Sequence, residues 1–165
     1  MEFIVRDWLE TDLVKIKELL QITWLDAYTF IPHEDLLCYL ENNYNEKKFH
    51  ETFLDKNNFG FVVESNNQIV AYLRNHINEE EKRFYVTSLY VLPSYQGFGL
   101  GNLLLNKAEE IAKRLEYYEI WLGVMSENIK SINWYKKKGF HFVEELPFQM
   151  CSTIVQHLIG FKEIQ

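Results

Sequence analysis

Three glycines at alternate positions mark the segment with the clearest potential for chemistry. Gly97, Gly99 and Gly101 lie within five residues, although the chain of 165 residues holds only seven glycines. An apolar segment, Val86–Val91, and the strand-breaking Pro93 precede them, and a predicted helix follows. Glycines leave backbone N–H groups uncovered, and a helix N-terminus adds unpaired N–H groups and the positive end of the helix dipole. This order of residue types predicts a phosphate-binding loop.

Two well-known phosphate-binding motifs do not fit this loop. A Walker A loop needs Lys followed by Ser or Thr after its last glycine, and Asn102 stands five residues after Gly97 without such a pair. A dinucleotide-binding fingerprint needs its third glycine one position later than Gly101. Its ribose-binding acid should also close a strand, whereas Glu119 opens one. On the glycines alone, a flexible strand-to-helix loop remains an alternative.

A second candidate group lies on a predicted helix over residues 128–138, which Gly139 would end as its C-cap. A tyrosine hydroxyl has a pKa near 10, so Tyr135 stays protonated at neutral pH and can donate a proton to a leaving group. Asn128 lies seven residues earlier, two turns along the same face. Helical periodicity alone favours a plainer role for Tyr135, that of a core aromatic. An ordinary N-cap is the alternative for Asn128, and that role is compatible with a ligand contact.

The two segments together resemble the motifs of the GNAT N-acetyltransferase superfamily. Tyr95–Gly101, preceded by Leu89–Pro93, matches the superfamily loop Gln/Arg-x-x-Gly-x-Gly/Ala. Asn128–Phe140 (N-I-K-S-I-N-W-Y-K-K-K-G-F) matches its helix N-x-x-A-x-x-F-Y-x-K-x-G-F, with Ser131 and Trp134 as departures. The resemblance covers essentially the whole chain and implies acetyl-CoA as acetyl donor.

A closer resemblance is to the PaiA-like polyamine acetyltransferases. It rests on Ile120–Val124 (I-W-L-G-V), on the Y-K-K-K-G-F run and on the D-A-Y…E-D-L-L-C-Y-L-E-N segment. With the net charge of −7, it implies a small amine acceptor of polyamine type. A peptide or protein amine is the alternative acceptor. A homodimer is common among such relatives and is expected here on that ground alone.

The resemblance also implies a role for each motif. The glycine loop would hold the coenzyme A pyrophosphate, and the preceding strand would pair with the pantetheine amides like an added strand. A bulge near Pro93 would splay this strand from the one at Tyr118–Val124. Tyr135 would protonate the leaving thiolate after direct attack by the amine. The implied cofactor-binding residues are Leu89, Tyr90, Val91, Gln96, Gly97, Phe98, Gly99, Leu100, Gly101, Asn102 and Asn128.

No carboxylate stands where relatives often carry a general base. Thr87 occupies one such position, on the central strand, and Gly123 occupies the other. Glu127, Tyr85 or a water relay remain as candidates. The missing Glu favours another class of function, a non-catalytic acyl-CoA sensor, whereas the retained tyrosine opposes it.

Acceptor recognition is expected from the segment between the first two strands and from the closing hairpin. An acidic, aromatic slot for a cation would consist of Trp24, Asp26, Tyr28, Glu34 and Asp35. The alternative is that these aromatics belong to the core and the acids to the solvated surface.

The elements that position these residues follow from hydrophobic periodicity. Helices are expected within residues 11–28, with Thr11 as a cap candidate, and at 33–42, 46–55, 102–115 and 128–138. Strands are expected at 3–8, 59–64, 69–75, 83–91, 118–124, 140–144 and 148–161, with Asn66-Asn67 as a hairpin turn. We therefore expect one α/β (α+β) domain over residues 1–165. By resemblance, it holds a mixed, mostly antiparallel sheet of six to seven strands, flanked by about four helices and splayed between its two central strands.

Composition narrows the partners. The acidic balance disfavours nucleic acid and anionic membranes, and no apolar segment is long enough to span a membrane or to act as a signal peptide. Cys38 and Cys151 form no CxxC pair, and His33-Glu34 has no second His for an HExxH zinc site. We therefore expect neither a disulfide nor a structural zinc site, and we expect a cytoplasmic location.

Overall fold

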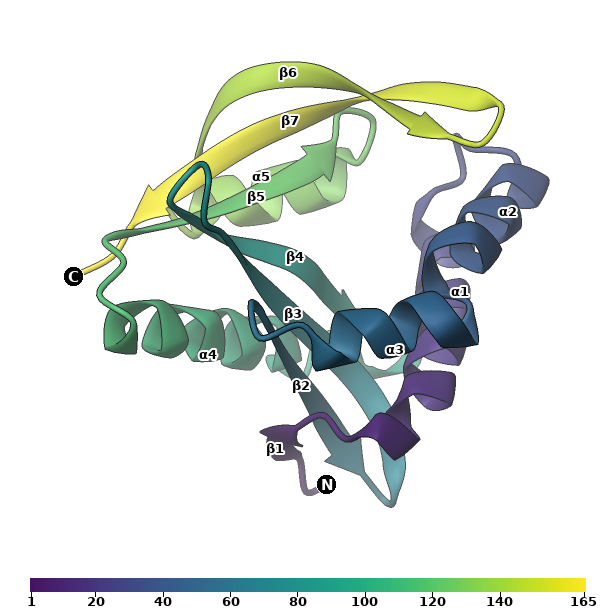
Figure 1. Cartoon of the computed structure of the whole chain (residues 1–165), viewed down its shortest axis with the longest axis horizontal. Coiled ribbons are helices and arrows are strands. Elements are labelled where there is room, and N and C mark those ends of the chain that lie inside the picture. The colour runs from purple at the N-terminus through teal and green to yellow at the C-terminus, as the bar shows by residue number, and fades with distance from the viewer.

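A seven-stranded sheet in the order β1-β2-β3-β4-β5-β7-β6 forms the centre of the computed structural model, which describes residues 1–165 (Figure 1). All neighbouring strands are antiparallel except β4 and β5. None of the helices combines the length and hydropathy needed to cross a membrane. The elements are β1 (Ile4–Asp7), α1 (Leu13–Ala27), α2 (His33–Tyr44), α3 (Glu46–Leu54), β2 (Asn58–Ser65), β3 (Gln68–Asn78), β4 (Arg83–Val91), α4 (Leu100–Arg114), β5 (Glu119–Met125), α5 (Ile129–Lys137), β6 (His141–Met150) and β7 (Thr153–Glu163).

The expected fold class is confirmed, with five α-helices instead of about four. The five helices lie in the five helical ranges expected from periodicity; only the number implied by the resemblance was lower. As expected, α2 and α3 are separate: the Asn45 backbone between them is extended, and its side chain accepts a hydrogen bond from the Lys48 N–H at 2.9 Å. The Asn66-Asn67 turn is found between β2 and β3, both residues having positive φ. α1 begins at Leu13, after a short 3-10 turn, so Thr11 is not its cap.

The two faces of the sheet carry different helices. The Trp8 ring stacks on Tyr72 of β3, and Trp24 of α1 lies against Tyr90 of β4. The side chain of Leu73, next to Tyr72, points to the opposite face, since side chains alternate along a strand. On that face α4 packs on β3, β4 and β5. The helices α1, α2 and α3 contact one another on the first face, so a ligand site between the central strands has walls from both layers.

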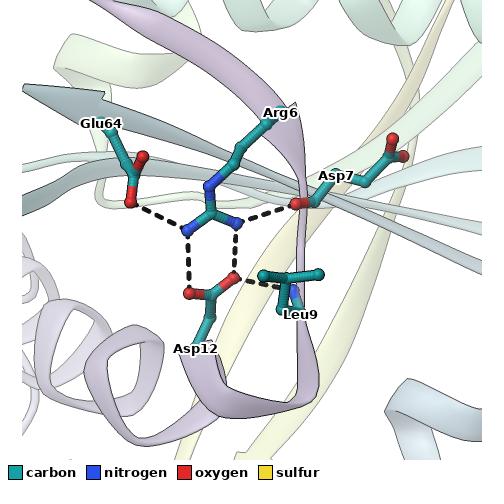
Figure 2. A network of polar contacts seen from close by, with 5 residues as sticks. All are labelled: Arg6, Asp7, Leu9, Asp12 and Glu64. Atoms are coloured by element: carbon teal, nitrogen blue, oxygen red, sulfur yellow. Dashed lines mark hydrogen bonds and ion pairs between the residues drawn. The ribbon is translucent and has the colours of Figure 1, made fainter. Parts of the chain in front are cut away.

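A network around Arg6 fixes α1 relative to the sheet (Figure 2). The guanidinium donates to both carboxylate oxygens of Asp12, at 2.7 and 2.9 Å, and to Glu64 on β2 at 2.9 Å. Asp12 also accepts the Leu9 N–H at 2.7 Å. The hydrogen bond from Arg6 holds the pKa of Asp12 below its ordinary value. Because Asp12 directly precedes α1, these contacts set where that helix begins.

The central strands β4 and β5 separate soon after they meet. Only Phe84–Ile120 and Tyr85–Trp121 are paired, although β4 continues to Val91 and β5 to Met125. The pairing of β4 with β3 shifts between Ser88 and Val86, which leaves Thr87 as a bulge residue. The expected splay is confirmed, but the bulge lies at Thr87 and not near Pro93. A bulge bends its strand and increases the local twist, so Thr87 lies where β4 turns away from β5.

The tip of the β6–β7 hairpin is fastened to α2, which the sequence did not predict. Cys38 of α2 and Cys151 in the hairpin turn form a disulfide across a sequence separation of 113 residues. The expectation that the two cysteines are unpaired is therefore wrong. The cysteines no longer support a reducing compartment for the protein. The hairpin turn also lies later than expected: β6 continues through Pro147 because it is an edge strand, where a missing N–H is tolerated.

Candidate active site

A cavity of about 510 Å³ opens where β4 and β5 diverge. Its walls come from α1, α2, β3, β4, β5, α5 and the β6–β7 hairpin. Because the strands are apart, side chains from both faces of the sheet reach the same space. Tyr135 enters from α5, whereas Tyr28 enters from the residue that follows α1, and Tyr90 from β4.

The predicted cofactor residues fall into two groups. Leu89, Tyr90, Val91, Gln96 and Asn128 line the cavity. The second group forms the loop and the first turn of α4 beyond the cavity: Gly97, Phe98, Gly99, Leu100, Gly101 and Asn102. Only Leu100 of this second group has a buried side chain, so the others leave the loop surface open.

The loop has the backbone geometry that its glycines suggest. Gly97 and Gly99 have φ values of +88° and +81°, and no atom lies within 4 Å of a Cβ added at either position. Gly99 precedes α4 without a side-chain cap, so the first N–H groups of α4 have no intrahelical partner. Exposed donors at the start of a 15-residue helix suit the phosphates of a nucleotide-type ligand.

Gly101 has a different reason to be glycine. A Cβ at this position would lie 3.2 Å from the Trp134 ring on α5. The glycine therefore lets the start of α4 approach α5 closely, and it sets the spacing between the loop and the helix that carries Tyr135.

The β4 edge that faces β5 has no strand partner beyond Tyr85. The Gln96 side chain spans part of this edge by donating to the Val91 carbonyl at 3.3 Å, and Lys130 of α5 donates to the Gln96 side chain at 3.2 Å. The remaining backbone groups of this edge are free to pair with an extended ligand arm that carries amides.

Tyr135 is half-buried and lies near two other tyrosines of the cavity wall. The Tyr28 and Tyr90 hydroxyls are 3.0 Å apart, and burial raises the pKa of Tyr90 to about 12. Burial also raises the pKa of Tyr135 above its ordinary value, with the neighbouring Tyr90 as a further cause. The Tyr135 ring packs edge-on against Trp134 and Phe140. Tyr135 thus stays protonated at neutral pH in a fixed orientation, as a proton donor requires.

Asn128 forms the N-cap of α5, accepting the Ser131 N–H at 3.3 Å. It also lines the cavity, so the cap does not exclude a ligand contact. Gly139 follows the helix with φ of +98°, as predicted for its C-cap.

Of the expected base candidates, only Tyr85 lines the cavity. Tyr85 donates to Glu81 and accepts from Arg83, which ties its hydroxyl to the hairpin outside the cavity. Glu127 is exposed and does not line the cavity. Thr87 donates to the Arg74 carbonyl at 2.9 Å.

His157 is a candidate proton acceptor that sequence reasoning missed. A Cβ on Gly123 would lie 3.2 Å from the His157 ring, so the imidazole occupies the space beside that glycine. His157 lines the cavity, and its Nδ1 has no hydrogen-bond partner in the protein. Burial holds its pKa below the ordinary value of 6.5, so the ring is neutral at pH 7. No motif marks this histidine, because β7 brings it to Gly123 only in the folded sheet.

The expected acidic slot forms only in part. Trp24, Asp26 and Tyr28 line the cavity, whereas Glu34 and Asp35 do not. Asp35 instead accepts hydrogen bonds from the backbone and hydroxyl of Ser152 and from the Thr153 hydroxyl. It therefore helps the disulfide hold the hairpin tip on α2.

Comparisons with known proteins agree with this geometry. An Acetyltransferase (GNAT) family model matches residues 16–140. An uncharacterised N-acetyltransferase of Methanocaldococcus jannaschii is 38% identical over 48% of this chain, and a thialysine N-epsilon-acetyltransferase of Mus musculus is 33% identical over 48%. The chain spans only 38% and 49% of the length of these two relatives.

The whole fold has a counterpart among solved structures. PaiA N-acetyltransferase from Thermoplasma acidophilum, in complex with coenzyme A, superposes with a TM-score of 0.86 at 20% identity, covering 99% of this chain and all of the other. At that identity the likeness concerns the fold alone. The family match covers most of the chain, including the glycine loop and Tyr135. The chain belongs to the GNAT acetyltransferase family.

Proposed function

We propose that this protein is an N-acetyltransferase that transfers an acetyl group from acetyl-CoA to a small primary amine. The observation that carries the proposal is the cavity at the splay, where Tyr135 and His157 enter a single space beside a glycine loop. Acetyl-CoA is a substrate here: it supplies an activated acetyl group as a thioester. The open donors at Gly97–Asn102 fit its phosphates, and the free edge of β4 fits the amides of its pantetheine arm.

The reaction needs two proton transfers, and Tyr135 and His157 each carry out one of them. The amine nitrogen forms a bond to the acetyl carbon as the carbon–sulfur bond breaks. Tyr135 gives its proton to the departing thiolate, and neutral His157 takes the proton that the amine loses. Its lowered pKa keeps it able to accept a proton at neutral pH. The Tyr28–Tyr90 pair also lines this cavity, with its hydroxyls 3.0 Å apart.

Tyr135→Phe tests the proton donor. It removes one hydroxyl and keeps the ring that packs on Trp134 and Phe140. We expect kcat to fall by about 10²- to 10⁴-fold in a thiol-release assay, with coenzyme A affinity by calorimetry unchanged. Tyr118→Phe is the matched control, because Tyr118 is 79% exposed and lies outside the cavity. A Tyr135→Phe enzyme with full kcat would contradict the assigned role.

The same assay separates the rival functions. A sensor binds coenzyme A tightly but releases no thiol with any acceptor, in which case Tyr135→Phe has no turnover to remove. A peptide amine acetyltransferase turns over short peptides and not free amines. The polyamine acceptor and the homodimer stay predictions from resemblance; spermidine and spermine in the panel test the first, and sedimentation tests the second.

A further inference from the structure

Arg74 is the one inward-facing arginine of the chain without a carboxylate partner. Arg6 and Arg83 form ion pairs with acids, and Arg114 lies exposed on α4. Arg74 lines the cavity from β3, and its guanidinium donates only to neutral oxygens: Asn58 at 3.2 Å and the Tyr44 hydroxyl at 3.3 Å. A guanidinium carries two N–H donors on each Nη atom, so each Nη of Arg74 keeps one donor for a ligand.

The surroundings of the Arg74 guanidinium supply no negative charge. Its polar neighbours are Asn58 and the hydroxyls of Tyr44 and Tyr72, all of them neutral groups. An inward guanidinium without a counter-charge costs free energy. A ligand carboxylate would supply that counter-charge, because its two oxygens match the planar fork of an arginine.

The position of Arg74 separates it from the phosphate loop. Arg74 pairs in register with Ser88, next to the Thr87 bulge, three positions before the end of β4 at Val91. The glycine loop follows that end of β4. The Arg74 fork therefore lies at the opening of the splay, in a wall that also holds Tyr39 and Tyr44 of α2. We expect the acceptor to bind in this part of the cavity, away from the glycine loop.

We propose that the acceptor amine also carries a carboxylate, as an amino acid does, and that Arg74 binds this carboxylate. The inference rests on the proposed function, since it names the class of acceptor for that reaction. Asp26 is the other fully charged residue of the cavity wall. One arginine and one aspartate suit a zwitterion better than they suit a polyamine, which offers no negative group to Arg74.

The test compares acceptors that differ only in the carboxylate: lysine, lysinamide and cadaverine, with alanine and alaninamide as a second pair. We expect kcat/KM in thiol release to be about 10- to 100-fold higher for the carboxylate member of a pair, the range for a hydrogen-bonded charge. Higher values for lysinamide or cadaverine than for lysine overturn the inference.

Arg74→Gln then assigns the preference to this residue. We expect it to raise KM for the carboxylate acceptor by a similar factor, to leave KM for the amide unchanged and to keep coenzyme A affinity. Arg74→Lys restores part of the preference, because it keeps the charge without the fork. Arg114→Gln is the matched control. An equal loss of kcat for every acceptor would overturn carboxylate binding and place Arg74 in the chemical step.

Two readouts keep this inference distinct from the proposed function. Absence of coenzyme A binding and of thiol release contradicts the acetyltransferase proposal itself. If coenzyme A binds but no acceptor turns over, the binding of acetylated products tests the inference instead. Acetyl-lysine should raise the melting temperature of the coenzyme A complex more than acetyl-cadaverine does. Equal shifts overturn the inference. If Arg74→Gln fails to fold, the acceptor pairs with the unmodified enzyme still decide.

Discussion

Removing the Cys38–Cys151 disulfide should destabilise the protein and loosen the part of the cavity wall that the β6–β7 hairpin forms. The bond closes a loop with a sequence separation of 113 residues, for which the chain-entropy model gives about 5 kcal/mol at 25 °C. In a domain of this length, 1 kcal/mol shifts the melting temperature by about 2–4 °C. The double variant Cys38→Ala with Cys151→Ala should therefore melt about 10–20 °C lower than the oxidised protein.

Calorimetry with and without a reductant is the assay. The oxidised protein should lose melting temperature on reduction, whereas the double variant should not respond. Asn42→Ala is the matched control: its amide lies 3.5 and 3.8 Å from the two sulfur atoms, so it perturbs the same place and leaves the bond intact. A shift below about 2 °C on reduction, or two titratable thiols in the folded protein, would refute the reasoning.

Loss of the disulfide should affect binding of the amine and leave binding of coenzyme A nearly unchanged. The disulfide holds the hairpin that carries Phe148 and Met150 of the cavity wall, and Tyr39 of α2 packs on Phe148 with ring centres 5.6 Å apart. The glycine loop lies outside this wall. Reduction should therefore raise KM for the amine while the affinity for coenzyme A stays within about twofold, a result that activity assays under both conditions can check.

Three further changes test other parts of the structure. Asp12→Asn should lower the free energy of unfolding by about 1.5–3 kcal/mol at pH 7, measured by urea unfolding. Because the pKa of Asp12 is lowered in the folded state, the difference between the two proteins should shrink as the pH falls through that pKa. A difference that stays constant with pH would contradict the Arg6 contact. Gly99→Ala should cost about 1–2 kcal/mol, the strain of a positive φ without a clash, and a larger loss in urea unfolding would mean crowding that the structure lacks. In a pH series, kcat/KM should fall on the acid side as His157 becomes protonated below its lowered pKa. His157→Gln should lower kcat/KM and abolish this fall at acid pH. If the variant keeps the fall, His157 is excluded as the base.

Local patterns predicted the parts of the site that lie close together in the chain. The positive φ values of Gly97 and Gly99, the cap at Asn128 and the C-cap at Gly139 each follow from residue type within a few positions. For the same reason the order of helices and strands was largely predictable.

Features that depend on distant segments were not predictable. Arg74 and His157 face one cavity because β3 and β7 approach it from opposite sides of the splay. Each is an ordinary polar residue in its own strand, so no local pattern singles it out. The Cys38–Cys151 pair, likewise, has no spacing signal across 113 residues. Asp35 looked like a ligand-binding acid, and only the position of the hairpin turn shows that it binds Ser152 and Thr153.

The two-pair contact between β4 and β5 also bears on how the protein folds. The strands β2, β3 and β4 form successive hairpins, and β6 and β7 form another, so pairing within each group is local in sequence. The strand β5 belongs with the second group because it pairs with β7, and the sheet joins the two groups only at Phe84–Ile120 and Tyr85–Trp121. A boundary with so few backbone pairs is a place where a sheet can open locally before it unfolds as a whole. We therefore expect amide protons of β5 near Gly123 to exchange through partial opening, well before global unfolding exposes β3.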